Sequence, residues 1–280
     1  MSLGYVDGRV VPLAEATVPL TDRGYLLGDG LFETMRAQNG HVFRLEEHAA
    51  RLRHGLHVLG LDEGLITAFR DAVGALVTAA DPGELYLRVH VTTGPFRDVP
   101  GMDPEPAVTG LCRPLAGYPG SAYAGLRLVT SAHRKDRRSP LSTVKHMSYL
   151  PHVLARRQAI ADGADDALLL NEAGRAAEAT TANVIAFRDG VAYAPGPGEG
   201  ALEGVTRGVL LATIAEAAEL RFSLPLDVLA EAEEAVLTNT SGGAVPVTRL
   251  DEAAIGDGRP GPWAGRLRDA YLKAVEEETR

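Results

Sequence analysis

The sequence lacks several features that would point to whole classes of protein. Cys112 is its single cysteine, which excludes an internal disulfide and any zinc site built from cysteines. No apolar run approaches the roughly 18 residues of a membrane span, and the first residues lack the basic-then-apolar pattern of a signal peptide. We therefore expect a cytoplasmic protein with no membrane partner and no metal site, with Cys112 buried on a strand.

An excess of positive charge is also missing. The 28 lysines and arginines are outnumbered by 37 aspartates and glutamates, which gives a formal net charge of −9. A protein that binds nucleic acid needs a basic face, so no nucleic-acid partner is expected. The 280 residues, 45% hydrophobic and 23% charged, have the composition of a globular enzyme of one or two domains.

The hydrophobic pattern predicts a small α/β domain at residues 1–113. The expected elements are a hairpin turning at Asp7-Gly8, a loop at 21–30, helices at 46–59 and 65–79, and paired strands at 85–93 and 108–112. Alternation with period two places Tyr86, Arg88 and His90 on one face of the first of these strands.

A stretch rich in proline and glycine, residues 114–124, predicts a linker to a larger domain at 125–280. That domain has expected strands at 126–131, 166–170 and 235–238, and expected helices at 205–220 and 263–277. We expect the basic segment 133–138, which follows the first of these strands, to be a solvated surface turn; the alternative is that residues 134–138 lie near a substrate entrance.

Lys145 lies in a run of small, hydroxylic and apolar residues that we expect to open a helix continuing to residue 159. Its neighbours Val144, Met147 and Leu150 have core character, so the ammonium must pair, extend to solvent or lose its proton. A desolvated lysine with a lowered pKa is the usual amine of Schiff-base chemistry. The plainer alternative is a surface lysine, because buried lysines are rare.

Three further features accompany this lysine. Residues 204–207, Gly-Val-Thr-Arg, open a helix whose free amides suit a phosphate, and the small-residue turn at 238–243 offers hydroxyls and amides. Glu178 stands between small residues where a ligand can approach closely. Taken alone, the helix start and the turn are better explained as a helix cap and a tight turn, and Glu178 is explained as well by a salt bridge.

Together these features match the needs of pyridoxal phosphate. This cofactor requires a lysine for a Schiff base, a phosphate cup, and a carboxylate that keeps its pyridine nitrogen protonated. The released lysine then transfers a proton as general acid and base. The combination predicts pyridoxal phosphate as the cofactor and Lys145 as the catalytic residue.

The order of these motifs resembles the fold-type IV pyridoxal-phosphate enzymes: branched-chain aminotransferases, D-amino-acid aminotransferases and aminodeoxychorismate lyases. The resemblance runs nearly end to end, through residues 22–33, Glu47-His48 with Arg51-Leu52, Lys145, Glu178 with Asn183, 204–207, and 238–240 before Pro246-Val247. It implies a two-domain α/β fold with the cofactor between the domains. It also implies a homodimer in which a second subunit completes the active site.

Carried over by position, the resemblance implies a role for each matching residue. Lys145 would be the Schiff-base lysine and catalytic base, and Glu178 would pair with the pyridine nitrogen, near Asn183. The phosphate ligands would be Arg51, Val205, Thr206 and Thr240. Tyr149 resembles the tyrosine on the ring hydroxyl of branched-chain enzymes, with a spacing from the lysine that is one residue shorter here.

The substrate side combines features of several branches. Tyr86 and Arg88 match the Tyr-x-Arg of branched-chain enzymes, and an arginine fork suits a carboxylate. D-specific enzymes use Arg-x-His just after this strand, where the present sequence has Arg97 but no histidine. Phe32 and Arg23, in the motif at 22–33, are the other substrate-binding candidates, so three arginines remain open for the substrate carboxylate.

The expected activity is that of a pyridoxal-phosphate-dependent aminotransferase, acting on an amino acid and a 2-oxo acid. The donor classes are D-amino acids, branched-chain L-amino acids or (R)-amines. The alternative within the family is 4-amino-4-deoxychorismate lyase, which eliminates pyruvate to give 4-aminobenzoate; Lys145-His146 and the residues that follow resemble that branch. An alternative of another class is a non-catalytic protein that binds pyridoxal phosphate.

Overall fold

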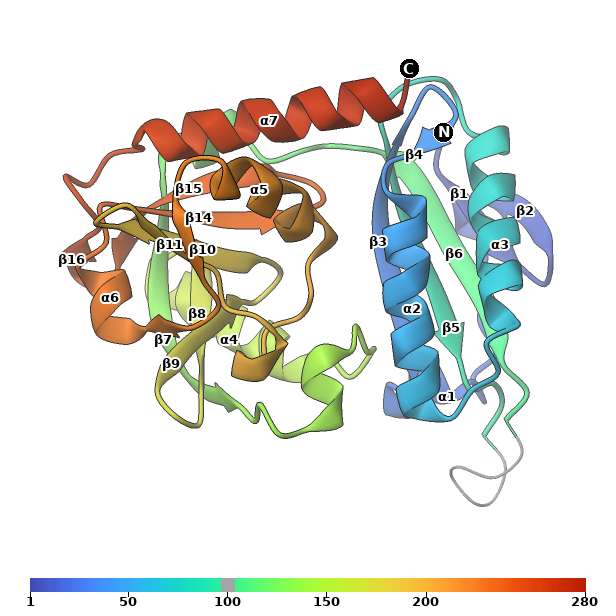
Figure 1. Ribbon diagram of the computed structural model, residues 1–280. Coiled ribbons are helices and arrows are strands. Elements are labelled where there is room, and N and C mark those ends of the chain that lie inside the picture. Colours follow the sequence, from blue (N-terminus) through green and yellow to red (C-terminus); the bar gives the residue numbers. More distant parts are fainter. Residues whose placement is uncertain (97–103) are drawn as a thin grey trace. The chain divides into compact units, whose positions relative to one another are not determined.

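The computed structural model describes residues 1–96 and 104–280, which form two compact units (Figure 1). The first unit comprises Met1–Ala116, Val144–Tyr149 and Glu276–Arg280, and the second comprises Gly117–Thr143 and Leu150–Val275. The mixed α/β fold expected from the sequence is confirmed. The units differ from the expected domains in three places: the expected linker 114–124 is divided between them after Ala116, and segments 144–149 and 276–280 belong to the first unit.

The first unit contains a six-stranded antiparallel sheet with the strand order β2-β1-β6-β5-β3-β4. Its strands are β1 (Leu3–Val6), β2 (Arg9–Pro12), β3 (Gly30–Gln38), β4 (His41–Val42), β5 (Leu85–Thr92) and β6 (Ala107–Pro114). The first hairpin turns at Asp7 and Gly8, as predicted, and both residues have positive φ angles of 51° and 75°. Cys112 of β6 is fully buried, also as predicted.

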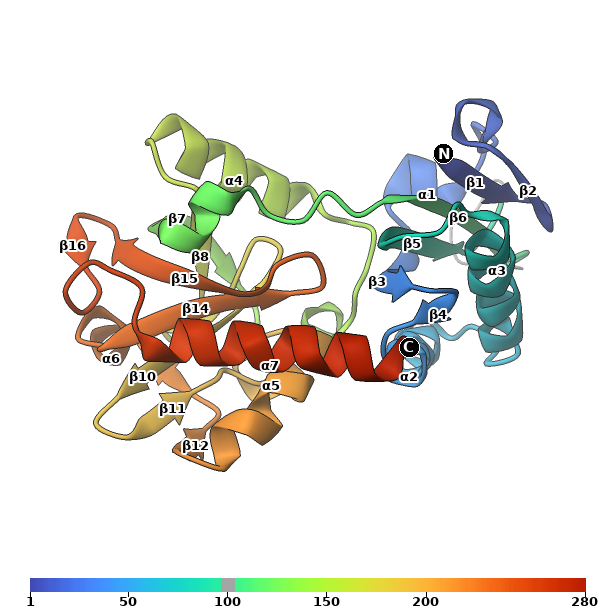
Figure 2. The same ribbon diagram turned by 90° about the horizontal axis from the view of Figure 1, so that it is seen from above.

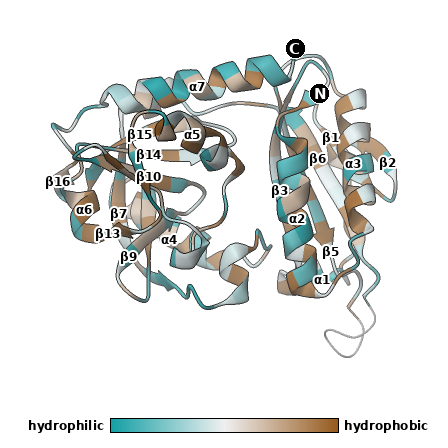
Figure 3. Ribbon diagram, in the orientation of Figure 1, coloured by the Kyte–Doolittle hydropathy of each residue, from teal (hydrophilic) through white to brown (hydrophobic). Residues whose placement is uncertain are grey.

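Two helices, α2 (Leu45–Leu59) and α3 (Leu65–Ala79), cover one face of this sheet (Figures 1 and 2). Their apolar residues, including Leu56 and Phe69, form one core with Leu87 and Val89 of β5. Figure 3 shows the alternation of hydrophobic and hydrophilic positions along both helices. The other face of β5 carries the half-buried side chains of Tyr86, Arg88 and His90, which confirms the predicted alternation.

Residues 21–30 contain a short helix where the sequence predicted only a loop. Helix α1 (Arg23–Leu27) begins after Asp22, whose carboxylate accepts a hydrogen bond from the amide of Tyr25 at 3.1 Å. It ends at Gly28, which adopts the left-handed conformation with φ 68°. The cap at each end stabilises a helix too short to be recognised from hydrophobic periodicity. A further short element, η1 (Leu13–Glu15), precedes it.

The second unit contains a ten-stranded sheet with the order β12-β11-β10-β14-β15-β7-β8-β9-β13, and β16 pairs with β15. An additional pairing of β9 with β10, at Glu178 and Asn183, closes part of this sheet on itself. The strands are β7 (Leu126–Lys135), β8 (Asp166–Asn171), β9 (Arg175–Ala179), β10 (Asn183–Arg188), β11 (Val191–Tyr193), β12 (Glu219–Arg221), β13 (Leu224–Pro225), β14 (Glu234–Asn239), β15 (Gly243–Leu250) and β16 (Ala253–Ala254).

The second unit's main core contains the buried side chains of Leu168, Val184, Leu237 and Val245. The remaining helices are α4 (Leu150–Ala161), α5 (Val205–Ala215), α6 (Leu226–Ala230), α7 (Pro262–Glu278) and the short η2 (Gly120–Ala124), η3 (Pro140–Thr143) and η4 (Pro197–Glu199). Helix α5 begins where predicted and ends earlier than the predicted residue 220. Within 1–96 and 104–280, no helix has the length and apolarity needed to cross a membrane.

Candidate active site

Lys145 lies on an extended segment beside β3, so the prediction that it opens a helix is wrong. The amide of Phe32 donates to the carbonyl of Lys145 at 2.9 Å, and the amide of Met147 donates to the carbonyl of Gly30 at 2.8 Å. These bonds hold residues 144–149 against the strand, and α4 begins only at Leu150. Tyr149 is therefore not placed one helical turn beyond the lysine.

Phe32 is the centre of the side-chain cluster around the lysine. Its ring, 3% exposed, lies 4.5 Å from Nζ of Lys145 and 3.8 Å from Cζ of Arg88. Tyr149 meets the same ring edge-on, with 5.8 Å between the ring centroids. A cation near an aromatic face is attracted by the ring quadrupole. Phe32 thus brings the amine and a guanidinium together, which creates a positive site suited to an anionic ligand.

Arg88 is held from a second side by His90. Nε of Arg88 donates to Nε2 of His90 at 2.9 Å. Burial, followed by the charge of Arg88, lowers the pKa of His90 to about 4, so the imidazole is neutral at pH 7 and can accept this bond. Tyr86 lies on the same face of β5, where the guanidinium of Arg113 stacks on its ring at 4.3 Å.

Arg51 binds a buried carboxylate that the sequence analysis did not single out. Its Nε and Nη2 donate to the two oxygens of Glu33 at 2.8 and 2.6 Å, and Nδ1 of His48 lies 2.7 Å from Glu33. Burial would raise the pKa of Glu33, but the charge and hydrogen bonds of Arg51, with those of His48, lower it to about 2. Burial also lowers the pKa of His48. The sequence signal was in two motifs of the family resemblance: residues 22–33, which end at Glu33, and Glu47-His48 with Arg51-Leu52.

The other arginine candidates for the substrate carboxylate differ from Arg88. Arg23 is buried and forms an ion pair with Asp29, which also accepts a hydrogen bond from the hydroxyl of Thr93 at 2.8 Å. Its charge is therefore balanced within the first unit. Arg97 lies outside the described residues.

Glu178 of β9 is the buried carboxylate of the second unit, with 7% of the residue exposed. One oxygen accepts hydrogen bonds from the amide of Leu202 at 2.9 Å and from the side chain of Asn183 at 3.5 Å. The other forms an ion pair with Lys135 and lies 3.8 Å from Nε2 of His152. Burial raises the pKa of Glu178, whereas the charge of Lys135 and the hydrogen bonds lower it to about 2, so the carboxylate is ionised.

Lys135 was missed by the sequence analysis and corrects one of its predictions. Strand β7 continues to Lys135, and the lysine side chain is 9% exposed, so segment 133–138 is not simply a solvated turn. Arg134 and Arg138 are exposed, as predicted. Nothing in the local sequence distinguishes this lysine from the arginines around it.

The start of α5 has the form expected of an anion-binding helix terminus. Gly204 precedes the helix and offers no side-chain cap for its first amides, those of Val205 and Thr206 among them. A Cβ atom at position 204 would lie 1.9 Å from the side-chain oxygen of Asn183, so only glycine fits this approach. In the turn after β14, the carbonyl of Thr240 accepts a hydrogen bond from Tyr271 at 2.8 Å.

One buried hydroxyl tests whether these residues fit a cofactor. Oγ1 of Thr238 is buried and has no hydrogen-bond partner among residues 1–96 and 104–280. Thr238 pairs with Asn183 between β14 and β10, and Asn183 pairs with Glu178 between β10 and β9. An unsatisfied hydroxyl, an uncapped helix start and an ionised carboxylate suit a ligand with both a phosphate and a basic ring nitrogen. The residues present therefore fit pyridoxal phosphate.

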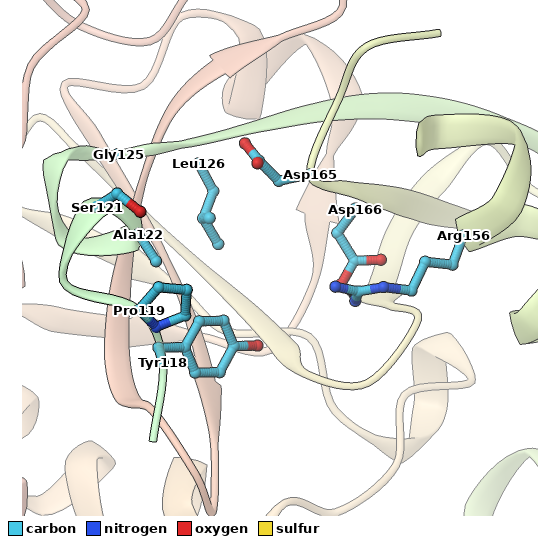
Figure 4. Close-up of a pocket in the computed structure, with 9 residues that line it drawn as sticks. All are labelled: Tyr118, Pro119, Ser121, Ala122, Gly125, Leu126, Arg156, Asp165 and Asp166. Atoms are coloured by element: carbon cyan, nitrogen blue, oxygen red, sulfur yellow. The ribbon is translucent and has the colours of Figure 1, made fainter. Parts of the chain in front are cut away.

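A cavity of about 250 Å³ in the second unit has a different character (Figure 4). Arg156 reaches across to Asp166 at 2.8 Å, and the hydroxyl of Tyr118 accepts a hydrogen bond from Asn239 at 2.9 Å. Asp165 accepts a hydrogen bond from the amide of Arg127 at 2.7 Å. The charged groups of this cavity are thus paired within the chain, and none of the predicted site residues lines it.

A lysine amine, an uncapped helix start and an ionised carboxylate are kinds of group that pyridoxal phosphate requires, and the sequence relatives point to the same class of enzyme. The family Amino-transferase class IV matches residues 30–250. The D-alanine aminotransferase of Bacillus licheniformis is 29% identical over 98% of this chain and 97% of its own length. A putative branched-chain-amino-acid aminotransferase of Methanocaldococcus jannaschii is 31% identical over 95% of this chain and 94% of its own.

Solved structures lead to the same family. A T.th. branched-chain amino acid aminotransferase, complexed with N-(5'-phosphopyridoxyl)-L-glutamate, has a TM-score of 0.86 at 29% identity, covering 99% of this chain and 95% of its own. A fold IV-transaminase from Curtobacterium pusillum has a TM-score of 0.85 at 28% identity, covering 97% and 99%. The chain belongs to the class IV aminotransferases, which are pyridoxal-phosphate enzymes. The predicted family, fold, enzyme class and cofactor are confirmed.

Proposed function

We propose that this aminotransferase moves the amino group of an amino acid to a 2-oxo acid, with Lys145 as the reacting amine and Arg88 as the ligand of the substrate carboxylate. The observation that carries the proposal is the shared contact of both side chains with Phe32, at 4.5 and 3.8 Å from the ring centroid. A donor amine without a carboxylate would leave Arg88 without its anion. Amino acids are therefore favoured over (R)-amines as donors.

Two donor classes are supported by the relatives. The similarity to the D-alanine aminotransferase of Bacillus licheniformis supports D-amino acids as donors of this enzyme. The similarity to branched-chain aminotransferases supports branched-chain L-amino acids. Both classes present a carboxylate next to the reacting amine, and a guanidinium fork held on two sides suits that group. Phe32 and Tyr86 would contact the donor beside Arg88. The handedness depends on the side from which the carboxylate reaches Arg88.

Pyridoxal phosphate, when bound, supplies the electron sink for the negative charge that develops on the substrate Cα. The chain supplies the other functions. Lys145 would bind the cofactor and carry the proton to and from the substrate carbon. Glu178, held ionised, would keep the pyridine nitrogen protonated, with Asn183 orienting the carboxylate.

The remaining predicted residues would fix the cofactor's position. The phosphate would be bound by the first amides of α5, by Thr240 and by Arg51, whose guanidinium is oriented by Glu33. Tyr149 would contact the ring hydroxyl. Charged groups and hydrogen-bond donors that are already in position before the cofactor binds need not reorganise during the reaction.

The homodimer expected from the family resemblance is part of the proposal. Helix α1 exposes three consecutive large apolar residues, Tyr25, Leu26 and Leu27, at 66%, 48% and 50%. A second copy of the chain over this surface would remove it from water. Sedimentation equilibrium tests this directly: twice the mass of one chain supports the dimer, and a single-chain mass at micromolar concentration contradicts it.

The experiment that tests the proposed donor class follows the visible absorption of cofactor-loaded enzyme mixed with one donor at a time. The donors are D-alanine, D-glutamate, L-leucine, L-glutamate and (R)-1-phenylethylamine. We expect bleaching by amino acids of one handedness, and that handedness identifies the class. Fastest bleaching by the amine would contradict the role of Arg88.

Two other outcomes would replace the proposal. If no donor bleaches the enzyme while 4-amino-4-deoxychorismate yields pyruvate, the lyase alternative holds. If the protein binds the cofactor and performs neither reaction, it is a non-catalytic pyridoxal-phosphate-binding protein.

A further inference from the structure

We infer that Lys135 is a positioning residue of the active site, which keeps Glu178 ionised and fixed in place before the cofactor binds. The inference rests on the proposed pairing of Glu178 with the pyridine nitrogen. It adds to the site a residue from the basic segment 133–138. Lys135 acts through Glu178 and has no direct role toward the substrate.

The surroundings of Glu178 show why a cation is needed there. Burial favours the neutral form of a carboxyl group, and only 7% of Glu178 is exposed. Its polar neighbours come from four places in the second unit: Lys135 of β7, His152 of α4, Asn183 of β10 and the amide of Leu202. Asn183 and Leu202 contribute neutral donors, whereas Lys135 forms an ion pair in direct contact with Glu178.

The placement of Lys135 is costly without this role. A buried ammonium loses its hydration, and removing either partner of a buried pair leaves an uncompensated charge. Neighbouring residues of a strand point to opposite faces, and Arg134, which precedes Lys135, is exposed. The Lys135 side chain is 9% exposed and is directed to Glu178.

Strand β7 has a local irregularity that accompanies this placement. Between Thr130 and Arg134 the strand advances four residues while β8 advances two, from Leu168 to Leu170. Bulges of this kind re-aim side chains and occur frequently beside active sites. The regular register resumes at Lys135, which pairs with Asn171 of β8. The backbone of β7 is thus modified just before the lysine.

The consequence concerns the proton on Glu178. A protonated carboxyl group cannot stabilise a positive charge on a ring nitrogen, so a site whose glutamate is neutral would lose its proposed electrostatic function. Lys135 prevents this in the protein without cofactor. Methionine at position 135 keeps much of the side-chain shape and removes the charge, whereas arginine keeps the charge.

The first test uses the apoprotein and needs no activity. Infrared spectra at pH 7 are compared for wild type, Lys135→Met, Lys135→Arg and Lys135→Met/Glu178→Gln, with Lys273→Met, an exposed lysine of α7, as the matched control. We expect the carbonyl band of a protonated carboxyl group only in Lys135→Met, and its disappearance in the double variant. Lys135→Gln carries the same test if Lys135→Met does not fold. Absence of the band in a folded, uncharged variant would overturn the inference.

The second test titrates the apoproteins with pyridoxal phosphate by equilibrium dialysis. One unit of pKa corresponds to a tenfold change in a proton equilibrium, so we expect the cofactor Kd of Lys135→Met to rise by about tenfold or more. Lys135→Arg should recover most of the affinity, and Lys273→Met should match wild type. An unchanged Kd in Lys135→Met would also overturn the inference.

The failure of the proposed function is distinguishable from failure of the inference. Glu178→Gln with wild-type cofactor affinity and turnover would contradict the proposed role of Glu178, whatever the infrared spectra show. Conversely, an impaired Glu178→Gln together with a Lys135→Met that lacks the carboxyl band would leave the proposed function intact and remove Lys135 from it.

Discussion

The two units each contain a buried glutamate, and the two glutamates are paired in different ways. Glu33 and Glu178 have 1% and 7% of their surface exposed, and the pKa of each is lowered to about 2. Glu33 accepts hydrogen bonds from Nε and Nη2 of one arginine, Arg51. Glu178 is bound by a lysine, a backbone amide and an asparagine. The same balance of burial and positive charge therefore occurs in two different geometries.

The difference between these geometries indicates different tasks. A bidentate arginine pair is rigid and directional, so Glu33 suits the fixing of the Arg51 guanidinium. A lysine is a compact charge without a planar fork, and it can share a carboxylate with another cation. The neighbours of Glu178 in β9 and β10 are also small or amide-bearing. We therefore propose that Glu33 orients Arg51, the proposed phosphate ligand, whereas Glu178 itself faces the cofactor.

Replacing each glutamate by glutamine separates these tasks. Glu178→Gln should lower kcat by on the order of 10²- to 10³-fold, because an electrostatic group that acts on the reacting system is lost. The steady-state rate with the best amino-acid donor measures this. Glu172→Gln, at an exposed carboxylate paired with Arg137, should retain wild-type kcat. Equal losses of kcat in Glu178→Gln and Glu172→Gln would contradict a specific electrostatic role of Glu178.

Glu33→Gln should instead act mainly on stability. Removing one partner of a buried ion pair costs about 3 to 5 kcal/mol of unfolding free energy, since Arg51 and His48 remain buried. Urea unfolding of the apoprotein measures the change. Glu63→Gln is the matched control, because Glu63 pairs with Arg53 where both side chains are exposed, at 62% and 42%, and its loss should cost about 1 kcal/mol or less. A similar loss of unfolding free energy in the two variants would show that burial of the Glu33 ion pair adds nothing to its contribution to stability.

Acid should destabilise the protein through Glu33 in the first unit and Glu178 in the second. Each pKa is about 2 in the folded protein against an ordinary value of 4.5, so the unfolded chain binds more protons as the pH falls. The stability is therefore present above about pH 4.5 and lost as the pH falls toward 2, by on the order of 3 kcal/mol per group. His90, with its pKa lowered to about 4, adds a loss between pH 6.5 and 4. Unfolding free energies measured from pH 7 to 3 should fall less steeply in Glu33→Gln than in wild type, and parallel curves would contradict this prediction.

Arg88→Gln should raise the KM for amino-acid donors by about 10- to 100-fold, the range expected for loss of a hydrogen-bonded pair with a charged group. His90→Leu should have a smaller effect in the same direction, because Arg88 would keep only its contact with Phe32. The value of kcat/KM for (R)-1-phenylethylamine, which has no carboxylate, is the control and should not fall. An equal loss for the amine and the amino acids would show that Arg88 does not bind a carboxylate.

Thr238→Val should have the smallest effect. It should make the apoprotein more stable and weaken the binding of pyridoxal phosphate. The variant removes a buried hydroxyl with no partner among the described residues, which should raise the stability of the apoprotein by about 1 kcal/mol. If the hydroxyl serves the cofactor, the Kd of pyridoxal phosphate should rise by a few-fold, by about 1 kcal/mol or less. A gain in apoprotein stability without a weaker Kd would remove Thr238 from the binding site.

The sequence predicts the elements whose pattern is local. Helix α3 has its predicted bounds, the first hairpin turns at its predicted residues, and β5 alternates as expected. The family motifs were sufficient to predict the enzyme class and cofactor, because their order along the chain is specific.

The errors concern features that depend on distant strands. Residues 144–149 have a helix-compatible composition, but hydrogen bonds to β3, more than a hundred residues earlier, hold them extended. Lys135 is buried because β7 continues past a bulge against β8, and no local pattern encodes that register. Glu33 and His48 belong to two separate family motifs, and their pairing with Arg51 became evident only from the packing of α2 on β3. The predicted roles of the site residues themselves remain predictions.

The most direct test of the central claim is the stoichiometry of a single half-reaction. Cofactor-loaded wild-type enzyme is mixed with excess of its best amino-acid donor in the absence of any 2-oxo acid, and the released 2-oxo acid is counted per active site. We predict about one equivalent, with loss of the visible cofactor absorption, and none from Lys145→Ala, because aminotransfer stops after one turn without an acceptor. Continued release of many equivalents, or release by Lys145→Ala at the wild-type rate, would contradict an aminotransferase that depends on Lys145.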